Sequence, residues 1–258
     1  MKVVILAGGR GTRIAEESKL TPKPMIRIGE EPILWHIMKE YSHYGFNEFI
    51  ICAGYKQQVI KEWFNNYMLY NSDITFDFSD DEKKIIVHKK NYEPWQVTIV
   101  DTGLDTLTGG RIKRVKEYLN NETFMMTYGD GVSDIDIKKL LEFHKSHGKL
   151  ATLTSFVIEQ QKGVLKVDKR GTIKEFREKN IIDGSLINAG YMVLEPQVLD
   201  YIDGDDTIFE KEPIEKLVSD GQLAAYKHNG FWKCMDTMKD KEELESLWNS
   251  GQAKWKVW

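Results

Sequence analysis

The 258-residue sequence contains little cysteine and no long apolar run. Its two cysteines, Cys52 and Cys234, have no partner at the spacing of metal ligands, and a disulfide framework is absent. The apolar run at residues 3–6 is too short for the core of a signal peptide, and no later run approaches the length of a membrane span. We therefore expect a cytoplasmic protein with reduced thiols and no membrane partner.

An excess of basic residues is also missing. The chain has 36 Lys and Arg against 40 Asp and Glu, which gives a formal net charge of −4. The basic residues are interleaved with acidic ones, so we expect no nucleic-acid partner. An anionic small ligand would need a local positive site. With 41% hydrophobic and 29% charged residues and no internal repeat or linker, the chain reads as one globular unit.

The first third of the chain alternates short apolar segments with amphipathic ones. Residues 3–6 and 48–52 are predicted strands, and residues 32–44 and 57–67 are predicted helices. This rhythm predicts an α/β fold with a parallel sheet and helices on both faces.

The rhythm changes after the second helix. Three predicted strands follow one another without helices at 74–78, 85–88 and 97–100. The remaining predicted helices are 112–119, 135–147, one near 209–220, and 238–248. The remaining predicted strands are 124–128, 151–157, 164–167, 172–176, 188–194 and 223–228, with a hairpin turn at 168–171.

The strongest motif is the glycine-rich segment at residues 6–13, Leu-Ala-Gly-Gly-Arg-Gly-Thr-Arg, directly after the first strand. Its glycines let backbone amides approach phosphate oxygens. Arg13 can hold a phosphate bidentately, and Lys23 adds a compact charge. The alternatives are a tight turn with two solvated cations, or a dinucleotide fold, whose third glycine is missing here.

Two aspartates are candidate metal ligands. Asp130 follows the predicted strand 124–128, at the strand end where open α/β sheets bind ligands. Asp236 precedes the last predicted helix. Mg²⁺ favours one or two carboxylates together with phosphate oxygens and water. Alternatively, Asp130 forms an Asx turn and Asp236 is a helix N-cap, a role that is compatible with metal binding.

Residues 106–111, Thr-Leu-Thr-Gly-Gly-Arg, form a further candidate site before a helix. Hydroxyls, glycines and an arginine suit an anion or a base. The segment is equally typical of a loop that leads into a helix whose Arg111 is solvated, and the spacing does not separate the two interpretations.

Together, residues 6–13, the Pro-Lys-Pro-Met at 22–25 and the Gly-Asp at 129–130 resemble the sugar-nucleotidyltransferase family. The combination is specific, and the resemblance extends along the chain through 32–38, 93–95, 100–103, 108–111, 128–131 and 235–237. It implies a single domain over 1–258 with a Rossmann-like, mixed but mainly parallel sheet flanked by helices. Within it, residues 1–135 would bind the nucleotide, 136–228 the acceptor, and 229–258 would form a small C-terminal extension.

The resemblance also implies roles for individual residues. The implied catalytic residues are Arg13, Lys23 and Asp130, and the implied ligands of Mg²⁺ are Asp130 and Asp236. The implied acceptor-binding residues are Glu178, Lys179 and Asn188. The implied nucleotide-binding residues are Leu6, Ala7, Gly8, Gly9, Arg10, Gly11, Thr12, Arg13, Lys23, Thr106, Thr108, Gly110, Arg111 and Gly129.

The implied reaction transfers CMP from CTP to glucose 1-phosphate in a cytoplasmic homo-oligomer. Lys162, Asn180 and Ala189 depart from the family pattern around the acceptor site. These departures leave open a cytidylyltransferase that uses another small phosphate. A non-catalytic, nucleotide-binding regulatory paralogue is a further alternative, although it would be free to lose the charged residues retained here.

Overall fold

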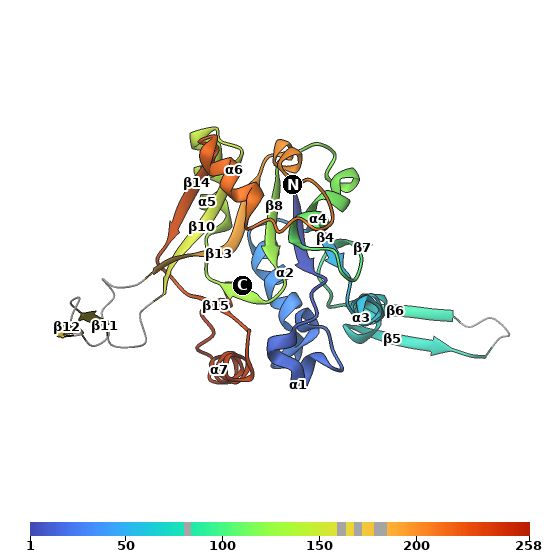
Figure 1. The fold of residues 1–258 in the computed structure, drawn as a ribbon. Coiled ribbons are helices and arrows are strands. Elements are labelled where there is room, and N and C mark those ends of the chain that lie inside the picture. Colours follow the sequence, from blue (N-terminus) through green and yellow to red (C-terminus); the bar gives the residue numbers. More distant parts are fainter. Residues whose placement is uncertain (80–83, 159–163, 168–171, 178–184) are drawn as a thin grey trace.

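The computed structural model describes residues 1–79, 84–158, 164–167, 172–177 and 185–258, and its centre is a seven-stranded sheet (Figure 1). The strand order is β14-β10-β13-β8-β1-β4-β7. These strands are β1 (Lys2–Ala7), β4 (Glu48–Ala53), β7 (Gln96–Asp101), β8 (Phe124–Tyr128), β10 (Ala151–Ile158), β13 (Ser185–Leu194) and β14 (Leu223–His228). Only β13 among them runs opposite to its neighbours. The predicted mixed, mainly parallel sheet is confirmed.

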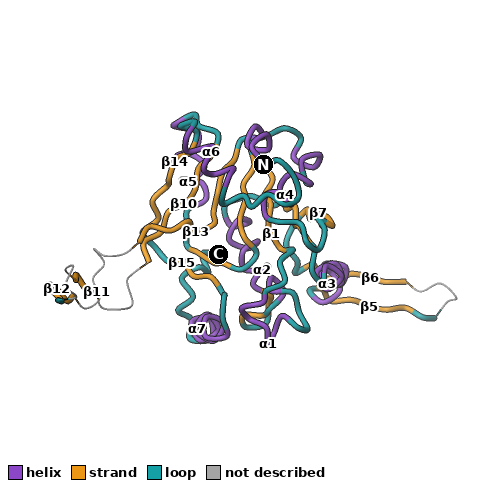
Figure 2. Tube along the Cα trace, viewed as in Figure 1, coloured by secondary structure: helices purple, strands orange, loops and turns teal. Residues whose placement is uncertain are grey.

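Helices cover both faces of this sheet (Figure 2). They are α1 (Ala15–Ser18), α2 (Ile33–His43), α3 (Gln57–Tyr70), α4 (Thr108–Arg114), α5 (Ile137–His147), α6 (Glu212–Ser219) and α7 (Met238–Asn249). Proline at the N-cap position starts α2, and the Asp136 side chain caps α5 by accepting a hydrogen bond from the Lys139 amide. The helix predicted at 112–119 begins earlier, at Thr108, and continues after a break as the 3₁₀ helix Lys116–Leu119.

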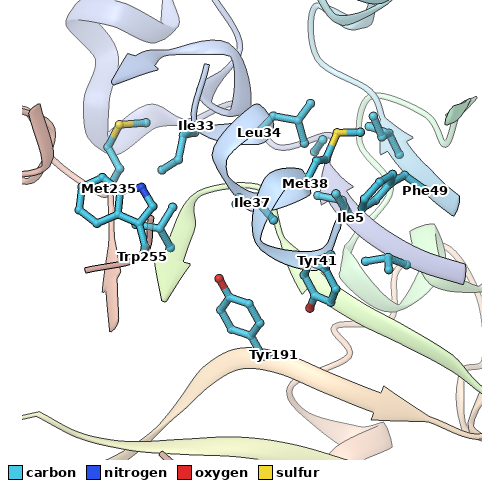
Figure 3. Packing of buried hydrophobic residues seen from close by; sticks show 14 of the residues in the cluster. Ile5, Ile33, Leu34, Ile37, Met38, Tyr41, Phe49, Tyr191, Met235 and Trp255 are labelled. Carbon is cyan, nitrogen blue, oxygen red and sulfur yellow. The ribbon is translucent and has the colours of Figure 1, made fainter. Parts of the chain in front are cut away.

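The sheet separates two hydrophobic cores. Successive side chains of a strand point to opposite faces, and β1 therefore contributes to both. Its Val3 and Ile5 belong to the core around α2, and its Val4 and Leu6 to the core around α4 and α6. Figure 3 shows the first core, in which α2 packs between the sheet and the C-terminal segment. An all-apolar strand is thus explained by burial on both faces.

In the described part of the chain, four two-stranded sheets accompany the central one. They pair β2 (Arg27–Ile28) with β3 (Glu31–Pro32), β5 (Ser72–Asp77) with β6 (Lys84–Lys90), β9 (Gly131–Ser133) with β15 (Trp232–Cys234), and β11 (Val164–Val167) with β12 (Ile173–Arg177). The β5–β6 hairpin projects from the body (Figure 1). The predicted pairing of 164–167 with 172–176 is confirmed, although its turn at 168–171 lies outside the described residues.

The C-terminal extension packs into the main core. The ring of the buried His36 on α2 lies 4.6 Å from the Trp248 ring and 6.2 Å from the Trp255 ring. Trp255 is itself buried, and Figure 3 shows it beside Met235 and Ile33. This contact fixes the position of α7 and of the strand that precedes it. Among the described residues, no helix has both the length and the apolarity needed to cross a bilayer.

Candidate active site

The glycine-rich segment lies at the carboxyl end of β1, between the ends of β4 and β8. Glycine is required at Gly8 because a Cβ there would lie 2.0 Å from Nη1 of Arg111. A Cβ on Gly54, after β4, would lie 2.5 Å from the same atom. The strand ends therefore close around one guanidinium, and only residues without a side chain allow this approach.

Arg111 is buried, and its guanidinium donates to backbone oxygens of two loops and, through Nη1 at 3.3 Å, to Ala53 O at the end of β4. Its Nη1 donates to Gly103 O at 2.8 Å and to Thr102 Oγ1 at 2.8 Å, and its Nη2 donates to Gly8 O at 3.2 Å. Burial lowers the pKa of the guanidinium from its usual value. The interpretation of Arg111 as a solvated residue is wrong. Its donors are used to hold the strand ends together, which shapes the adjoining cavity.

A cavity of about 380 Å³ opens beside this cluster, and we call it the nucleotide cavity after the nucleotide-binding residues predicted from the sequence. That volume is within the range of small-molecule sites. The lining residues are Leu6, Ala7, Gly8, Gly9, Gly11, Thr12, Arg13, Lys23, Pro24, Thr106, Leu107, Thr108, Arg111, Tyr128, Gly129, Asp130 and Asp236. All but two of the predicted nucleotide-binding residues lie here, although they come from four separate segments of the chain.

The two exceptions are Arg10 and Gly110. Arg10 forms an exposed ion pair with Asp105, at 2.8 Å. Gly110 lies in α4 against another loop, where a Cβ would approach Cα of Asp205 to 2.6 Å. Gly110 is thus explained by helix packing, and Arg10 by a contact between the glycine-rich segment and the loop before α4.

Asp130 and Asp236 are brought together by the pairing of β9 with β15. In this pairing Cys234 lies opposite Gly131, and the Met235 amide donates to the Asp130 backbone oxygen at 2.8 Å. Asp236 is not the N-cap of α7, because Thr237 takes that position and forms a capping box. The Asp236 carboxylate is therefore free to face Asp130.

Lys23 lies between the two carboxylates. Its Nζ is 2.6 Å from Asp130 Oδ2 and 2.7 Å from Asp236 Oδ1. Burial of Lys23 opposes its charge, but the two carboxylates outweigh burial and raise its pKa. Burial likewise opposes the charge of Asp236, and the hydrogen bond from Lys23 outweighs it and lowers the pKa of Asp236. Arg13 adds a second cation, with Nη1 2.8 Å from Asp236 Oδ2.

The carboxylate pair is a suitable binding site for a cation. Both aspartates already share one positive group, the Lys23 ammonium. Among the described residues there is no cluster of three or more His, Cys, Asp or Glu that could enclose a metal by itself. The donor set therefore fits an ion such as Mg²⁺, which uses one or two carboxylates and completes its shell with phosphate oxygens and water.

A second cavity of about 260 Å³ also adjoins the carboxylate pair, and we call it the acceptor cavity after the predicted acceptor residue Asn188, which lines it. It shares Arg13, Tyr128, Asp130 and Asp236 with the nucleotide cavity. Its remaining lining residues are Thr127, Gly131, Asn188, Ala189, Tyr191, Trp232 and Cys234. The two cavities thus meet at the charged residues.

The walls of the acceptor cavity are fixed by contacts between β13 and β15. The Trp232 indole donates to the Ala189 backbone oxygen at 2.7 Å. The Asn188 side chain accepts from the Gly190 amide at 2.9 Å. Gly190 has a φ of +83°, and a Cβ there would lie 2.5 Å from the Tyr128 ring. A glycine at this position therefore lets β13 approach the end of β8.

The acceptor residues expected from the sequence are only partly described. Asn188 lines the acceptor cavity, as expected. Glu178 and Lys179, and the departures at Lys162 and Asn180, lie outside the described residues. The third departure, Ala189, is buried and lines this cavity.

Sequence reasoning missed several residues of both cavities. Tyr128 separates the cavities, and its hydroxyl donates to Glu210. The Thr108 hydroxyl donates to the same carboxylate at 2.6 Å. Trp232 and Tyr191 line the acceptor cavity. Tyr128 and Trp232 lie close in sequence to Asp130 and Asp236, and this proximity could have identified them as site residues. Glu210 and Tyr191 had no comparable signal.

The nucleotidyl transferase family model matches residues 2–249, and the chain belongs to this family. Among individual relatives, the chain is 53% identical to the glucose-1-phosphate cytidylyltransferase of Salmonella typhimurium, over 100% of both chains. It is 46% identical to the probable glucose-1-phosphate cytidylyltransferase of Bacillus subtilis, again over 100% of both chains.

Solved structures agree on the fold. HddC from Yersinia pseudotuberculosis complexed with GMP-PN superposes with a TM-score of 0.67 at 21% identity, over 96% of this chain and 99% of the other. UDP-glucose pyrophosphorylase complexed with UDP-glucose gives a TM-score of 0.69 at 17% identity, over 97% and 98%. At such identities the likeness concerns the fold alone.

Proposed function

We propose that the protein transfers CMP from CTP to glucose 1-phosphate, which yields CDP-glucose and pyrophosphate. The observation that carries the proposal is the meeting of two cavities at a pair of carboxylates bridged by Lys23. Lys23 and Arg13 place positive charge where two anionic substrates would meet, and the carboxylates would hold a metal ion that stabilises further negative charge. The full-length identity of 53% to glucose-1-phosphate cytidylyltransferases of two Salmonella strains supports the choice of CTP and glucose 1-phosphate.

The proposed chemistry is an in-line displacement. A phosphate oxygen of the acceptor attacks the α-phosphorus of CTP, a new P–O bond forms, and the bond to the leaving pyrophosphate breaks. Both substrates are anionic, so catalysis depends mainly on their positioning and on charge stabilisation. A covalent enzyme intermediate is not needed.

The nucleotide cavity supplies the groups for the triphosphate. Amides of the segment 6–13 would bind phosphate oxygens, and Arg13 would hold the triphosphate. Lys23 is positioned at the boundary with the acceptor cavity, where the α-phosphate would lie. Asp130 and Asp236 would hold Mg²⁺, which would offset the repulsion between the two phosphates.

The acceptor cavity would hold the sugar phosphate. Asn188 and Trp232 present polar and aromatic groups to it. We further propose that Glu178 and Lys179 take part, with the Lys179 ammonium on the acceptor phosphate. Lys179→Ala should then raise the acceptor KM or lower kcat while CTP binding stays nearly intact.

Pyrophosphate release tests the proposed donor. At fixed concentrations of glucose 1-phosphate and Mg²⁺, kcat/KM should be higher for CTP than for ATP and GTP. UTP should have the kcat/KM nearest to that of CTP. A site that hydrogen-bonds the cytosine amine discriminates strongly against a base that lacks this group. Equal kcat/KM for CTP and dTTP would contradict the assignment.

A panel of acceptors at fixed CTP tests the second substrate. Glucose 1-phosphate should give the highest kcat/KM. If another phosphate supports turnover and glucose 1-phosphate does not, the assigned acceptor is wrong, but the assignment as a nucleotidyl transfer remains. No release with any acceptor would favour the non-catalytic alternative.

We also propose a cytoplasmic homo-oligomer, a state supported by the family resemblance. Light scattering of the purified chain tests the assembly, and a monomer mass at micromolar concentration would contradict it.

A further inference from the structure

A buried carboxyl group lies behind the active site. Glu40, on the face of α2 that packs against the sheet, is 0% exposed. Within the residues that the structure describes, the Tyr191 hydroxyl lies 2.7 Å from Glu40 Oε2, and Oε1 makes no hydrogen bond of normal geometry. No lysine or arginine of the described part pairs with it. A buried carboxylate without a cation is strongly unfavourable.

The Tyr191 hydroxyl lies between two oxygens. It is 2.7 Å from Glu40 Oε2 and 3.2 Å from the backbone oxygen of Gly131. A tyrosine hydroxyl carries one hydrogen and cannot donate fully to both. If Glu40 holds a proton, it donates to the Tyr191 oxygen, and Tyr191 donates to Gly131. Glu40 Oε2, the Tyr191 hydroxyl and the Gly131 backbone oxygen then each have a suitable partner.

The protonated form of Glu40 is also the form that burial favours. Burial raises the pKa of Glu40 well above its usual range, and nearby Asp134 acts in the same direction. The Tyr191 hydroxyl and the Ser133 amide act in the opposite direction but do not outweigh burial. The charge environment and the hydrogen-bond geometry therefore both favour a protonated Glu40.

This series of groups ends at the reaction centre. Gly131 directly follows Asp130 and is the first residue of β9. The same Gly131 lines the acceptor cavity, as does Tyr191. Figure 3 shows Tyr191 extending from β13 toward α2. The contact thus joins the core helix to a wall of the acceptor cavity and to the chain beside a proposed metal ligand.

We propose that Glu40 and Tyr191 are a buried positioning pair that holds the Asp130–Gly131 turn and the acceptor cavity in the geometry needed for transfer. The inference rests on the proposed function, because it concerns the same site. Neither residue is proposed to contact the reacting phosphates or to transfer a proton in the reaction. Their effect is exerted through the Gly131 backbone and the position of the Tyr191 ring.

Tyr41 provides a matched control. It is fully buried, and its ring stacks on that of Tyr191 with centroids 5.9 Å apart and an interplanar angle of 13°. Its hydroxyl makes no hydrogen bond of normal geometry to any described residue, although Thr127 is near enough to influence its pKa. Removing this hydroxyl changes the same layer of the core without touching the Gly131 contact.

The test compares Tyr191→Phe with Tyr41→Phe in the full chain. Kinetics are measured with CTP, Mg²⁺ and the acceptor that gives the highest wild-type turnover. Tyr191→Phe should lower kcat by about tenfold or more, since small displacements of a reacting group have effects of this size. Its KM for CTP should stay within about twofold, because the nucleotide cavity is not lined by Tyr191. Tyr41→Phe should leave kcat within about twofold.

Glu40→Gln and Glu40→Leu give an independent check. The glutamine amide can donate to Tyr191 as a protonated acid does, so Glu40→Gln should keep kcat within about twofold, whereas Glu40→Leu should lower it. Unchanged kcat in Tyr191→Phe, or equal losses in both tyrosine variants, would overturn the proposal. If the wild type releases no pyrophosphate with any acceptor, the proposed function fails and this inference fails with it. Wild-type turnover with an unaffected Tyr191→Phe would refute the positioning pair alone.

Discussion

The two cavities are built by different means. The nucleotide cavity is formed largely by loops at the ends of parallel strands, and Arg111 holds these loops together through hydrogen bonds to their backbone oxygens. The acceptor cavity is formed by side chains from β13 and β15, which are brought together by contacts between distant segments. The sequence predicts the nucleotide cavity through a glycine-rich motif. The acceptor cavity depends on pairings between distant segments, which no short motif encodes.

This difference predicts that the two cavities respond separately to mutation. Changes to the glycine loop should affect CTP, and changes at the β13–β15 contact should affect the acceptor. Only the residues shared by both cavities should affect both substrates; they are Arg13, Tyr128, Asp130 and Asp236. Variants of the shared residues should therefore have larger effects than variants that touch one cavity alone.

Asp130→Asn and Asp236→Asn remove charge at the boundary of the cavities. Each should lower kcat by at least about 10²-fold, the scale of losing one preorganised charge stabiliser. The fold should persist, because the side chains keep their shape. Turnover at saturating CTP, acceptor and Mg²⁺ checks the effect, and near-wild-type kcat in either variant would remove that residue from the proposed metal site.

Asp73→Asn is the control for these variants. Asp73 is an exposed residue of the β5–β6 hairpin, outside both cavities. Surface substitutions of this kind change stability by about 0.5 kcal/mol or less. Its kcat should equal that of the wild type. A loss of kcat as large as that of the Asp130 and Asp236 variants would indicate a general effect of removing an acidic residue, not a role at the boundary between the two cavities.

Gly8→Ala should affect the nucleotide cavity alone. The added methyl would collide with the Arg111 guanidinium, whose donors are fixed by backbone oxygens. We expect the KM for CTP to rise by about tenfold, or about 1.4 kcal/mol, with little change in the acceptor KM. The matched variant is Gly204→Ala, because Gly204 lies outside both cavities and a Cβ on it meets nothing within 4 Å. If both variants behave alike, packing on Arg111 is not the reason for the glycine.

Trp232→Phe should affect the acceptor cavity alone. It keeps an aromatic ring but removes the donor to the Ala189 backbone oxygen. Losing one such bond is worth about 1 kcal/mol, so the acceptor KM should rise about fivefold. A rise in the KM for CTP of the same size would contradict the separation of the cavities.

Glu40→Gln should change the pH dependence of stability. Burial raises the pKa of Glu40 in the native state, so between the unfolded and native pKa values the native state binds more protons. The free energy of unfolding contributed by this group therefore falls as the pH rises. Glutamine does not titrate, and the melting temperature of Glu40→Gln relative to the wild type should increase from pH 5 to pH 8. A constant or decreasing difference would mean that Glu40 is charged in the native protein.

Much of the fold follows from the sequence, because burial on both faces gives β1, β4 and β8 continuous apolar runs. The start of α2 followed from a local signal, the proline before it, whereas the helix predicted from residue 135 begins only at Ile137, after its N-cap Asp136. The order of strands across the sheet, and the reversed direction of β13, were not predictable in the same way. They depend on contacts between segments far apart in the chain.

The candidate site divides along the same line. Gly8, Arg13 and Lys23 belong to local motifs, and the structure places them at one cavity. The opposition of Asp130 and Asp236 arises from the short β9–β15 pairing, which the sequence pattern does not reveal. Likewise, the buried Arg111 had no signal that separated it from a solvated residue. Its role became visible only with the glycines that surround it.

The dependence of pyrophosphate release on both substrates tests whether the two cavities serve one reaction. Release is measured with CTP alone, with glucose 1-phosphate alone, and with both, at one concentration of Mg²⁺. If the cavities hold the two halves of one transfer reaction, release should occur only with both substrates and should match the CDP-glucose formed. Release from CTP alone at the same rate would contradict the account, because the acceptor cavity would then have no part in the reaction.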